Sequence, residues 1–529
     1  MPTSSPAPGT GGSTGAASLS QRGDAGLAEP HGNVFRNDRA ENLRGLPSDR
    51  ERGVRAMFTS SSAVGKARLF LDISTLVRWV GPPVGIMRVE AELARYVLER
   101  RPDIGFIVYD SCVQEYRLIM RSVVPDMIGG NLFIDFSGIP DPRSVSRPPV
   151  KAVLNRLDRR LLYFRRPRRA VILMLERFRV KRPPSRRSHI EFVQSLFFND
   201  RYRRAFFDSD GRRRSVVEFA DLFEAKPPAL KGATILAPGA EWNTKDPDRI
   251  RYLKERDGFR LVMICYDLIP ILFPQFYLPR DSEVFVNYFR KAIGFVDKFV
   301  CISNCTARDV VRFAEEQGNS CETSVQPLGS DLLETDDAPL PGTLKARRYA
   351  LFVSTIEPRK NHALLHRIWR RLLDAGIPQR HDFQLVFVGR PGWSTDALLR
   401  QFAEDARGDC NFHYLPNAGD GLLKRLYQDA AFCLYPSLYE GFGLPVIEAF
   451  AHGRAVIASD AGSIPEVVQD LSLSLDPKDE EAWYRTMLQW IEDPSTVASY
   501  EARIAERFVH RPWSEVAQKY LAEAETAPN

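Results

Sequence analysis

Residues 435–450 read Tyr435-Pro-Ser-Leu-Tyr-Glu440-Gly-Phe-Gly-Leu-Pro445-Val-Ile-Glu448-Ala-Phe450. A strand is predicted to end near Tyr435, two glycines permit a tight loop, and Pro445 suits the first helical position, where its missing N–H costs nothing. The start of that helix would present unpaired N–H groups and a partial positive charge, which suit a diphosphate or sugar hydroxyls. Glu448 would then lie in the first turn. The alternative is that Glu448 only complements the helix dipole and Glu440 is a solvated loop acid.

Short apolar runs repeat this strand and helix pattern along the chain. They do not alternate with polar residues, and helical patterns separate them, which is typical of buried parallel sheets. The runs are 67–74, 105–110, 233–237, 261–265 and 298–303 in the first half, and 349–353, 384–388, 432–435 and 455–458 in the second. Acids, prolines and Gly342 form a linker at 332–343. The sequence therefore predicts two doubly wound α/β domains with a ligand site at the carboxyl ends of their strands.

The chain has 529 residues, which is long enough for two large hydrophobic cores. Its composition, 44% apolar and 26% charged, is that of a globular protein. No stretch approaches the roughly 18 uncharged apolar residues of a spanning helix, and no secretory apolar region is found at the start. The seven cysteines are scattered without a C-x-x-C pair, so neither a disulfide framework nor a zinc site is indicated. We therefore expect a cytoplasmic protein with reduced thiols.

Glu440 and Glu448, with seven residues and the Gly-Phe-Gly-Leu-Pro core between them, resemble the E-x7-E signature of family-four retaining glycosyltransferases. The stretch from His452 to Val467 also resembles the sequence that follows this signature in that family. The resemblance implies the GT-B fold, in which two facing Rossmann-like, doubly wound domains leave a cleft between them. It places an N-terminal acceptor domain at 65–335, a C-terminal nucleotide-sugar domain at 345–505, and a last helix at 506–526 that crosses back to the first domain.

The same resemblance assigns roles on the donor side. Val353-Ser-Thr-Ile-Glu-Pro-Arg359-Lys360-Asn-His362 is similar to the family's first strand and loop, whose basic residues contact the donor diphosphate. Two cations there suit a leaving group on which negative charge grows; the alternative is a basic loop at a helix start. Arg359 and Lys360 are therefore candidate catalytic residues together with Glu440, which would hold the sugar. The remaining predicted donor contacts are Glu448, on the ribose hydroxyls, and Phe442, Gly443 and Leu444 in the loop.

In the first half, one stretch is similar to the opening sequence of a subgroup of this family that acts in bacterial surface-polysaccharide assembly. It consists of Leu71-Asp-Ile-Ser74 followed by Gly85-Ile-Met-Arg88-Val-Glu90. Tyr266-Asp267 resembles that subgroup's next marker, with Tyr266 where many members have a histidine. Gly85, Arg88, Tyr266 and Asp267 are therefore candidate acceptor-side or cleft residues. Arg88 and Asp267 could equally hold a helix and a loop in place.

Other motifs are weaker. Asp208-Ser-Asp210 and Asp246-Pro-Asp248 mimic a D-x-D metal motif, but their Gly- and Pro-flanked contexts favour turns. Neither a dinucleotide fingerprint opening the first helix nor a P-loop occurs, which argues against hydride and P-loop phosphoryl transfer. We expect no cofactor and no obligatory metal, with a nucleotide sugar as co-substrate.

The segment 143–187, inside a basic insertion at about 141–231, contains 16 Lys or Arg and two acids, with apolar residues between the cations. This mixture favours an amphipathic element on an anionic membrane surface, at the inner face of the membrane, over a solvated loop. Few aromatics are present for base stacking, so nucleic acid is not the expected partner. Residues 1–60 have the composition of a disordered tail, unless translation begins at Met57.

The resemblance implies transfer of a hexose, with mannose from GDP-mannose as the best choice, to a glycan or polyprenyl-diphosphate-linked acceptor in surface-polysaccharide biosynthesis. The alternatives are a sugar-nucleotide epimerase of the same fold and a non-catalytic binding protein. An epimerase would alter the free nucleotide sugar, whereas a transferase would release nucleoside diphosphate only with acceptor.

Overall fold

The computed structural model describes residues 68–79, 85–136, 215–330, 338–407, 411–416 and 418–526. The predicted tail at 1–60, the basic segment 143–187, the Asp208 motif and the linker up to residue 337 lie outside these residues. Among the described helices, none is both long enough and apolar enough to cross a membrane.

The second half contains a six-stranded parallel sheet in the order β12-β11-β10-β13-β14-β15. Its strands are β10 (Tyr349–Val353), β11 (Gln384–Val388), β12 (Phe412–Leu415), β13 (Phe432–Tyr435), β14 (Val456–Ser459) and β15 (Leu473–Leu475). The order reverses between β10 and β13, and doubly wound sheets bind ligands at the carboxyl ends of the strands at such a point.

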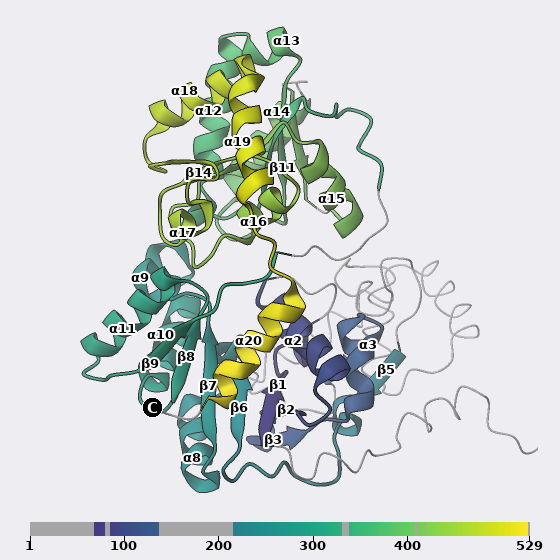
Figure 1. Ribbon diagram of the computed structural model, residues 1–529, viewed down its shortest axis with the longest axis vertical. Coiled ribbons are helices and arrows are strands. Elements are labelled where there is room, and N and C mark those ends of the chain that lie inside the picture. The colour runs from purple at the N-terminus through teal and green to yellow at the C-terminus, as the bar shows by residue number, and fades with distance from the viewer. Residues whose placement is uncertain are drawn as a thin grey trace, which may run out of the picture. The chain divides into compact units, whose positions relative to one another are not determined.

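Helices connect these strands and surround the sheet (Figure 1). They are α12 (His362–Asp374), α13 (Ile377–His381), α14 (Asp396–Arg407), α15 (Asp420–Asp429), α16 (Leu444–Ala451), α17 (Ile464–Val468), α18 (Glu480–Glu492) and α19 (Pro494–Arg507). A short 3-10 helix, η8 (Pro358–Lys360), follows β10.

The first half contains a seven-stranded sheet in the order β3-β2-β1-β6-β7-β8-β9, in which only the β2–β3 pair is antiparallel. The strands are β1 (Leu69–Asp72), β2 (Gly105–Asp110), β3 (Glu115–Leu118), β6 (Thr234–Ala237), β7 (Arg260–Cys265), β8 (Lys298–Cys301) and β9 (Glu322–Val325). The described helices are α2 (Ile86–Arg100), α3 (Val124–Ile128), α8 (Pro247–Asp257), α9 (Ile269–Leu272), α10 (Pro279–Ala292) and α11 (Asn304–Glu316). Strands β4 (Leu132–Asp135) and β5 (Ser215–Glu218) form a separate parallel pair. The predicted class, two doubly wound α/β sheets, is confirmed.

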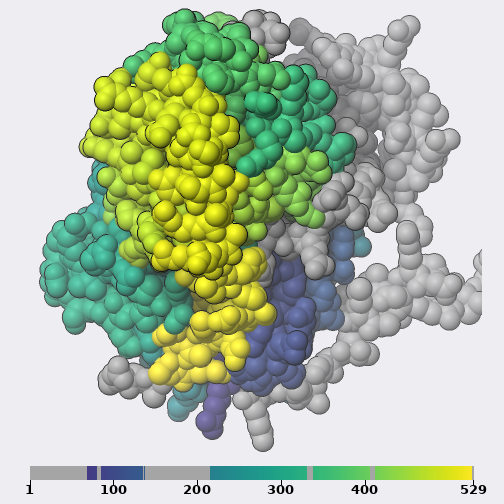
Figure 2. Space-filling view, turned by 45° about the horizontal axis from the view of Figure 1, so that its top comes forward, coloured from purple at the N-terminus to yellow at the C-terminus, as the bar shows by residue number. Residues whose placement is uncertain are grey.

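Three clusters of buried side chains fill the two halves. One surrounds the second sheet, and the other two cover opposite faces of the first sheet, because neighbouring residues of β1, Phe70 and Leu71, belong to different clusters. The last helix, α20 (Trp513–Glu525), contacts α2 and β6 and contributes Trp513, Tyr520 and Leu521 to one face of the first sheet. Figure 1 shows α20 beside α2, and Figure 2 shows the yellow C-terminal segment at the surface next to purple and teal atoms of the first half.

Candidate functional site

Glu440 lies where the strand order of the second sheet reverses. It belongs to the loop between β13 and α16, and the loop after β10 places η8 beside it. The guanidinium Nη1 of Arg359 lies 2.7 Å from Glu440 Oε2, and the Nζ of Lys360 lies 2.5 Å from Oε1. Glu440 is only 6% exposed. The structure therefore brings the three predicted catalytic residues together in one buried ion-pair cluster.

The charges of this cluster depend on one another. Burial by itself would raise the pKa of Glu440, but Arg359 and Lys360 outweigh burial and lower the pKa to about 2. The pKa of Lys360 is lowered by its own burial and by the neighbouring Arg359, although Glu440 and Glu357 oppose this shift. Glu440 is therefore an anion held by two cations, and it is not the solvated loop acid of the alternative interpretation.

The two cations are held differently. Arg359 donates to the backbone carbonyl of Tyr439 over 2.7 Å and to the carboxylate of Glu357 over 2.8 Å, in addition to its ion pair with Glu440. Lys360 donates to the hydroxyl of Tyr435 over 3.2 Å, and that hydroxyl in turn donates to Glu440 over 3.1 Å. Arg359 is thus fixed by several rigid acceptors, whereas Lys360 is a single point charge on a flexible stem that an added anion could attract.

Glu448 is paired with a residue of the first half. Its Oε1 lies 3.3 Å from Nη1 of Arg88 on α2, and its Oε2 accepts a 3.1 Å hydrogen bond from the Tyr427 hydroxyl. Burial raises the pKa of Glu448, while Arg88 and Tyr427 oppose the rise. The structure therefore joins a predicted donor-side residue to a predicted acceptor-side residue.

The start of α16 differs from the prediction by one residue. The helix begins at Leu444, so Pro445 is the second residue and Glu448 is the fifth. The first turn contains no acid, so the prediction that Glu448 lies in that turn is wrong, and with it the interpretation that Glu448 caps the dipole there. Gly443 precedes the helix with φ of 107°, a conformation that suits glycine. Phe442 and Leu444 pack against the buried cluster of the first half.

Gly441, which sequence reasoning did not single out, packs its backbone against the first half. A Cβ atom on Gly441 would lie 2.1 Å from the carbonyl oxygen of Tyr266 and 2.9 Å from the Cβ of Asp267. The Gly441 carbonyl accepts hydrogen bonds from the hydroxyls of Ser303, over 2.8 Å, and Thr306, over 3.3 Å. A backbone contact this close requires glycine. The presence of Gly441 inside the Glu440–Glu448 motif was therefore the feature of the sequence from which this contact could have been predicted.

The other predicted residues of the first half have different surroundings. Gly85 immediately precedes α2. Burial raises the pKa of Asp267, and the positive charge of Arg359 opposes this rise, so Asp267 belongs to the same electrostatic neighbourhood as the cluster; its carboxylate accepts a 3.0 Å hydrogen bond from the backbone N–H of Ile269. Tyr266 is buried, and its hydroxyl donates to the Pro238 carbonyl over 2.5 Å. The Tyr266 side chain therefore packs in the core, and its backbone is the part that meets Gly441.

The weaker motifs have structural roles. Asp246 caps α8 by accepting a hydrogen bond from the Asp248 N–H over 3.0 Å, so this segment is the start of a helix rather than the predicted turn. Cys301 and Cys305 are buried free thiols. In the described part of the chain, no group of three or more His, Cys, Asp or Glu is arranged to hold a metal ion.

Residues 341–507 match the family model described as "Glycosyl transferases group 1". The O-antigen chain mannosyltransferase B of Escherichia coli is 30% identical over 245 residues, which cover 45% of this chain and 62% of that protein. The serotype-specific mannosyltransferase WbdA of Escherichia coli is 28% identical over 239 residues, which cover 42% of this chain and 27% of that protein. These alignments span less than two thirds of either relative.

Among solved structures, Anabaena HepE, crystallised in complex with UDP and glucose, aligns with a TM-score of 0.50. The alignment covers 87% of this chain and 100% of that chain at 13% sequence identity, so the similarity is one of fold. The structural alignment extends over both sheets, whereas the family model matches only residues of the second half.

Proposed function

Residues 341–507 form a glycosyl transferases group 1 domain in a chain with the GT-B fold, and from this premise we propose that the protein is a retaining hexosyltransferase. The observation that carries the proposal is the buried Glu440, held between Lys360 and Arg359 beside the start of α16. The names of the related mannosyltransferases favour mannose as the transferred sugar and a surface glycan as the acceptor. We further propose GDP-mannose as the donor and allow a lipid-linked saccharide as the acceptor, as the motif resemblance implies.

Lys360 would supply most of the stabilisation of the leaving group. As the bond between the anomeric carbon and the diphosphate oxygen breaks, negative charge grows on that oxygen, and a positioned cation in a buried site stabilises it strongly. Arg359 would add its charge and keep Glu440 and the Tyr439 backbone in place. The acceptor hydroxyl bonds to the anomeric carbon on the face that the diphosphate leaves, and its proton passes to the departing phosphate. The products are nucleoside diphosphate and the extended glycan, and no metal is required.

The two glutamates would hold the donor at its two ends. Glu440 is anionic throughout the neutral range, so it can accept hydrogen bonds from sugar hydroxyls. Glu448 would accept hydrogen bonds from the ribose hydroxyls, with Arg88 opposing the rise in pKa that burial causes. The acceptor side would be formed by the loops that contain Gly85 and Asp267.

We also propose that the basic segment 143–187 holds the enzyme on anionic lipid at the cytoplasmic face of the membrane, where a polyprenyl-diphosphate-linked acceptor would be found. The test is sedimentation with vesicles containing phosphatidylglycerol. The full chain should sediment with these vesicles and the chain lacking 143–187 should not. Equal sedimentation of the two proteins would refute the membrane role.

The proposed donor can be tested by thermal denaturation with GDP-mannose, UDP-glucose and a dTDP-sugar. A donor present at about 100 times its Kd stabilises the native state by about 2.7 kcal/mol, which raises Tm by roughly 2–3 °C in a protein of this size. GDP-mannose alone should have this effect on the wild type, with a much smaller effect on Lys360→Gln. Lys345→Gln, an exposed lysine paired with Asp382, is the control.

Product analysis then tests the reaction. With a lipid-linked saccharide present, GDP should appear together with a mannosylated product, and EDTA should not prevent this. Conversion of GDP-mannose to another free nucleotide sugar would instead indicate an epimerase. If no nucleotide sugar stabilises the protein and none is consumed, the transferase assignment is wrong.

A further inference from the structure

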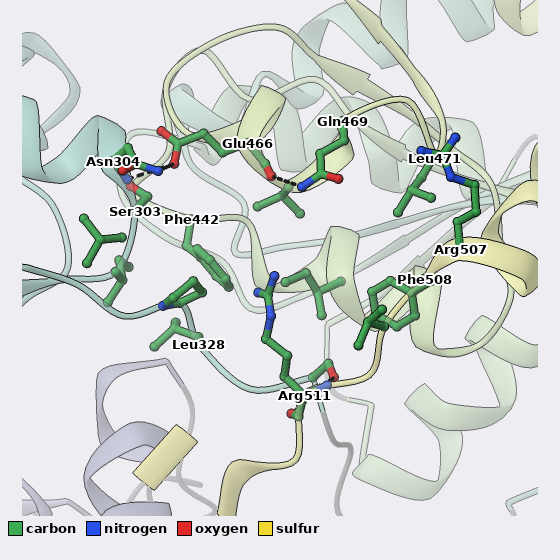
Figure 3. Close-up of a pocket in the computed structure, with 17 residues that line it drawn as sticks. Ser303, Asn304, Leu328, Phe442, Glu466, Gln469, Leu471, Arg507, Phe508 and Arg511 are labelled. Carbon is green, nitrogen blue, oxygen red and sulfur yellow. Dashed lines mark hydrogen bonds between the residues drawn. The ribbon is translucent and has the colours of Figure 1, made fainter. Parts of the chain in front are cut away.

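A cavity of about 400 Å³ lies outside the ion-pair cluster of Glu440, Lys360 and Arg359, none of which is among its described lining residues. Its walls come from segments far apart in the sequence (Figure 3). These are the loops after β8 and β9, the residues around Phe442 and Ile447, the α17 region at 466–471, and the connection 507–511 between α19 and α20. The volume is within the range of sites that bind small ligands.

Most of the wall is apolar. Leu328, Phe442, Ile447, Leu471 and Phe508 are among the side chains that line it. A side chain or ligand that displaced water from these walls would gain the free energy of burying apolar surface. An apolar portion is therefore expected in the occupant.

Arg511 supplies a positive charge inside these apolar walls. Its backbone is fixed, because its N–H donates to the Ser330 hydroxyl over 2.8 Å and its carbonyl accepts from the Ser330 N–H over 3.0 Å. Its side chain extends from this anchor between Phe442 and Phe508 (Figure 3). Within the described residues its guanidinium makes no hydrogen bond or ion pair.

The other charged residues of the cavity wall already have partners, and Glu466 also lies 3.7 Å from Arg308 Nη2. Glu466 accepts hydrogen bonds from the backbone N–H groups of Asn304, over 2.8 Å, and Cys305, over 2.6 Å. Arg507 is paired with Asp470. Lys519 and, more weakly, the charge of Arg511 lower the pKa of Glu515, but no ion pair between Arg511 and Glu515 is found within the described residues. The guanidinium can therefore bind an anion in the cavity, and guanidinium groups bind phosphate or carboxylate through two parallel hydrogen bonds.

We propose that this cavity binds a small amphipathic anion, with its phosphate or carboxylate group on Arg511 and its short apolar chain against Phe442 and Phe508. The site shares no charged residue with the Glu440 cluster, and Phe442, a predicted donor contact, is common to the two. Phe442 lies two residues from Glu440 in the same loop, so an occupant would also contact the segment that holds the candidate catalytic acid.

The test is isothermal titration of the full chain with octyl phosphate below its micellar concentration. The wild type should bind it, and inorganic phosphate and octanol should each bind much more weakly. Arg511→Gln should weaken binding by about 10- to 100-fold, the effect of removing a charged hydrogen-bonding partner. Arg511→Lys keeps the charge and should lose less. Arg485→Gln, an exposed arginine on α18, should bind as the wild type does.

Three outcomes would overturn the proposal. The first is equal binding by the wild type and Arg511→Gln, with both proteins folded by circular dichroism. The second is loss of binding in Lys360→Gln but not in Arg511→Gln, which would place octyl phosphate in the donor site. The third is that octyl phosphate binds the folded wild type no more tightly than inorganic phosphate or octanol does.

Discussion

Replacement of Gly441 by alanine tests whether the Glu440 loop meets the first half of the chain as described. The added Cβ would lie 2.1 Å from the Tyr266 carbonyl oxygen and 2.9 Å from the Asp267 Cβ. The first of these contacts is with backbone, which cannot rotate away. Relief therefore requires the loop or the strand end after β7 to move by more than 1 Å, on the order of the overlap with an ordinary contact distance.

The loss of folding free energy in Gly441→Ala can be worked out from the contacts that this movement of the loop disrupts. Overpacking in a well-packed region costs about 1–3 kcal/mol. The hydrogen bonds from Ser303 and Thr306 to the Gly441 carbonyl would lengthen, at about 1 kcal/mol each. We therefore expect a destabilisation of about 3 kcal/mol, which corresponds to a fall in Tm of roughly 3 °C in a protein of this size. Displacement of Glu440 should also weaken the binding of a nucleotide sugar.

Differential scanning calorimetry of Gly441→Ala beside Gly342→Ala provides the measurement. A Cβ on Gly342 would meet no atom within 4 Å, and φ there is not positive, so this control should change Tm by at most about 1 °C. If Gly441→Ala has the same Tm and nucleotide-sugar affinity as the wild type, the loop does not pack against Tyr266 in solution. The inferred join between the two halves would then be wrong.

Three further predictions concern the charged residues. Lys360→Gln should lower kcat by about 10²–10³-fold, because it removes stabilisation of the leaving group. The rate of GDP release is measured in a coupled assay, and an unchanged rate would contradict this role of Lys360. The pKa of Glu440 is about 2, below its ordinary 4.5, so its contribution of about 3 kcal/mol is complete above pH 4.5 and is lost as pH falls towards 2. The Tm difference between wild type and Glu440→Gln should therefore shrink as pH decreases from 7 to 3, and a constant difference would contradict the ion-pair account. Arg88→Gln should weaken nucleotide-sugar binding by about tenfold by leaving Glu448 without its cation, whereas Arg95→Gln on the same helix should not; equal affinities for the two variants would exclude the pairing role.

The sequence predicted the central strands well and missed the edges. The runs 349–353, 384–388 and 432–435 coincide with β10, β11 and β13, because these strands are buried on both faces and read as continuous apolar runs. The strands without such runs include β3, β9, β12 and β15, which are the four edges of the two sheets. Their side chains are partly exposed, so polar residues interrupt the apolar signal.

The candidate site was predictable where residues are close in sequence or belong to adjacent loops. Glu440, Arg359 and Lys360 follow neighbouring strands, and the reversal of strand order brings their loops together. The pairing of Glu448 with Arg88 could not be predicted, since it depends on how the two halves pack. Tyr435 and Tyr427, which hold the two glutamates, carry no local signal that separates them from ordinary core tyrosines.

The return of α20 to the first sheet has a consequence for biosynthesis. Trp513, Tyr520 and Leu521 complete a core whose strands leave the ribosome much earlier, since β9 ends at Val325. At about 5–20 residues per second, the first half must wait roughly ten to forty seconds for its last helix. During that interval the part of the first sheet's apolar face that α20 covers stays exposed on the nascent chain, where chaperones could bind it, while the second half can finish its own core first.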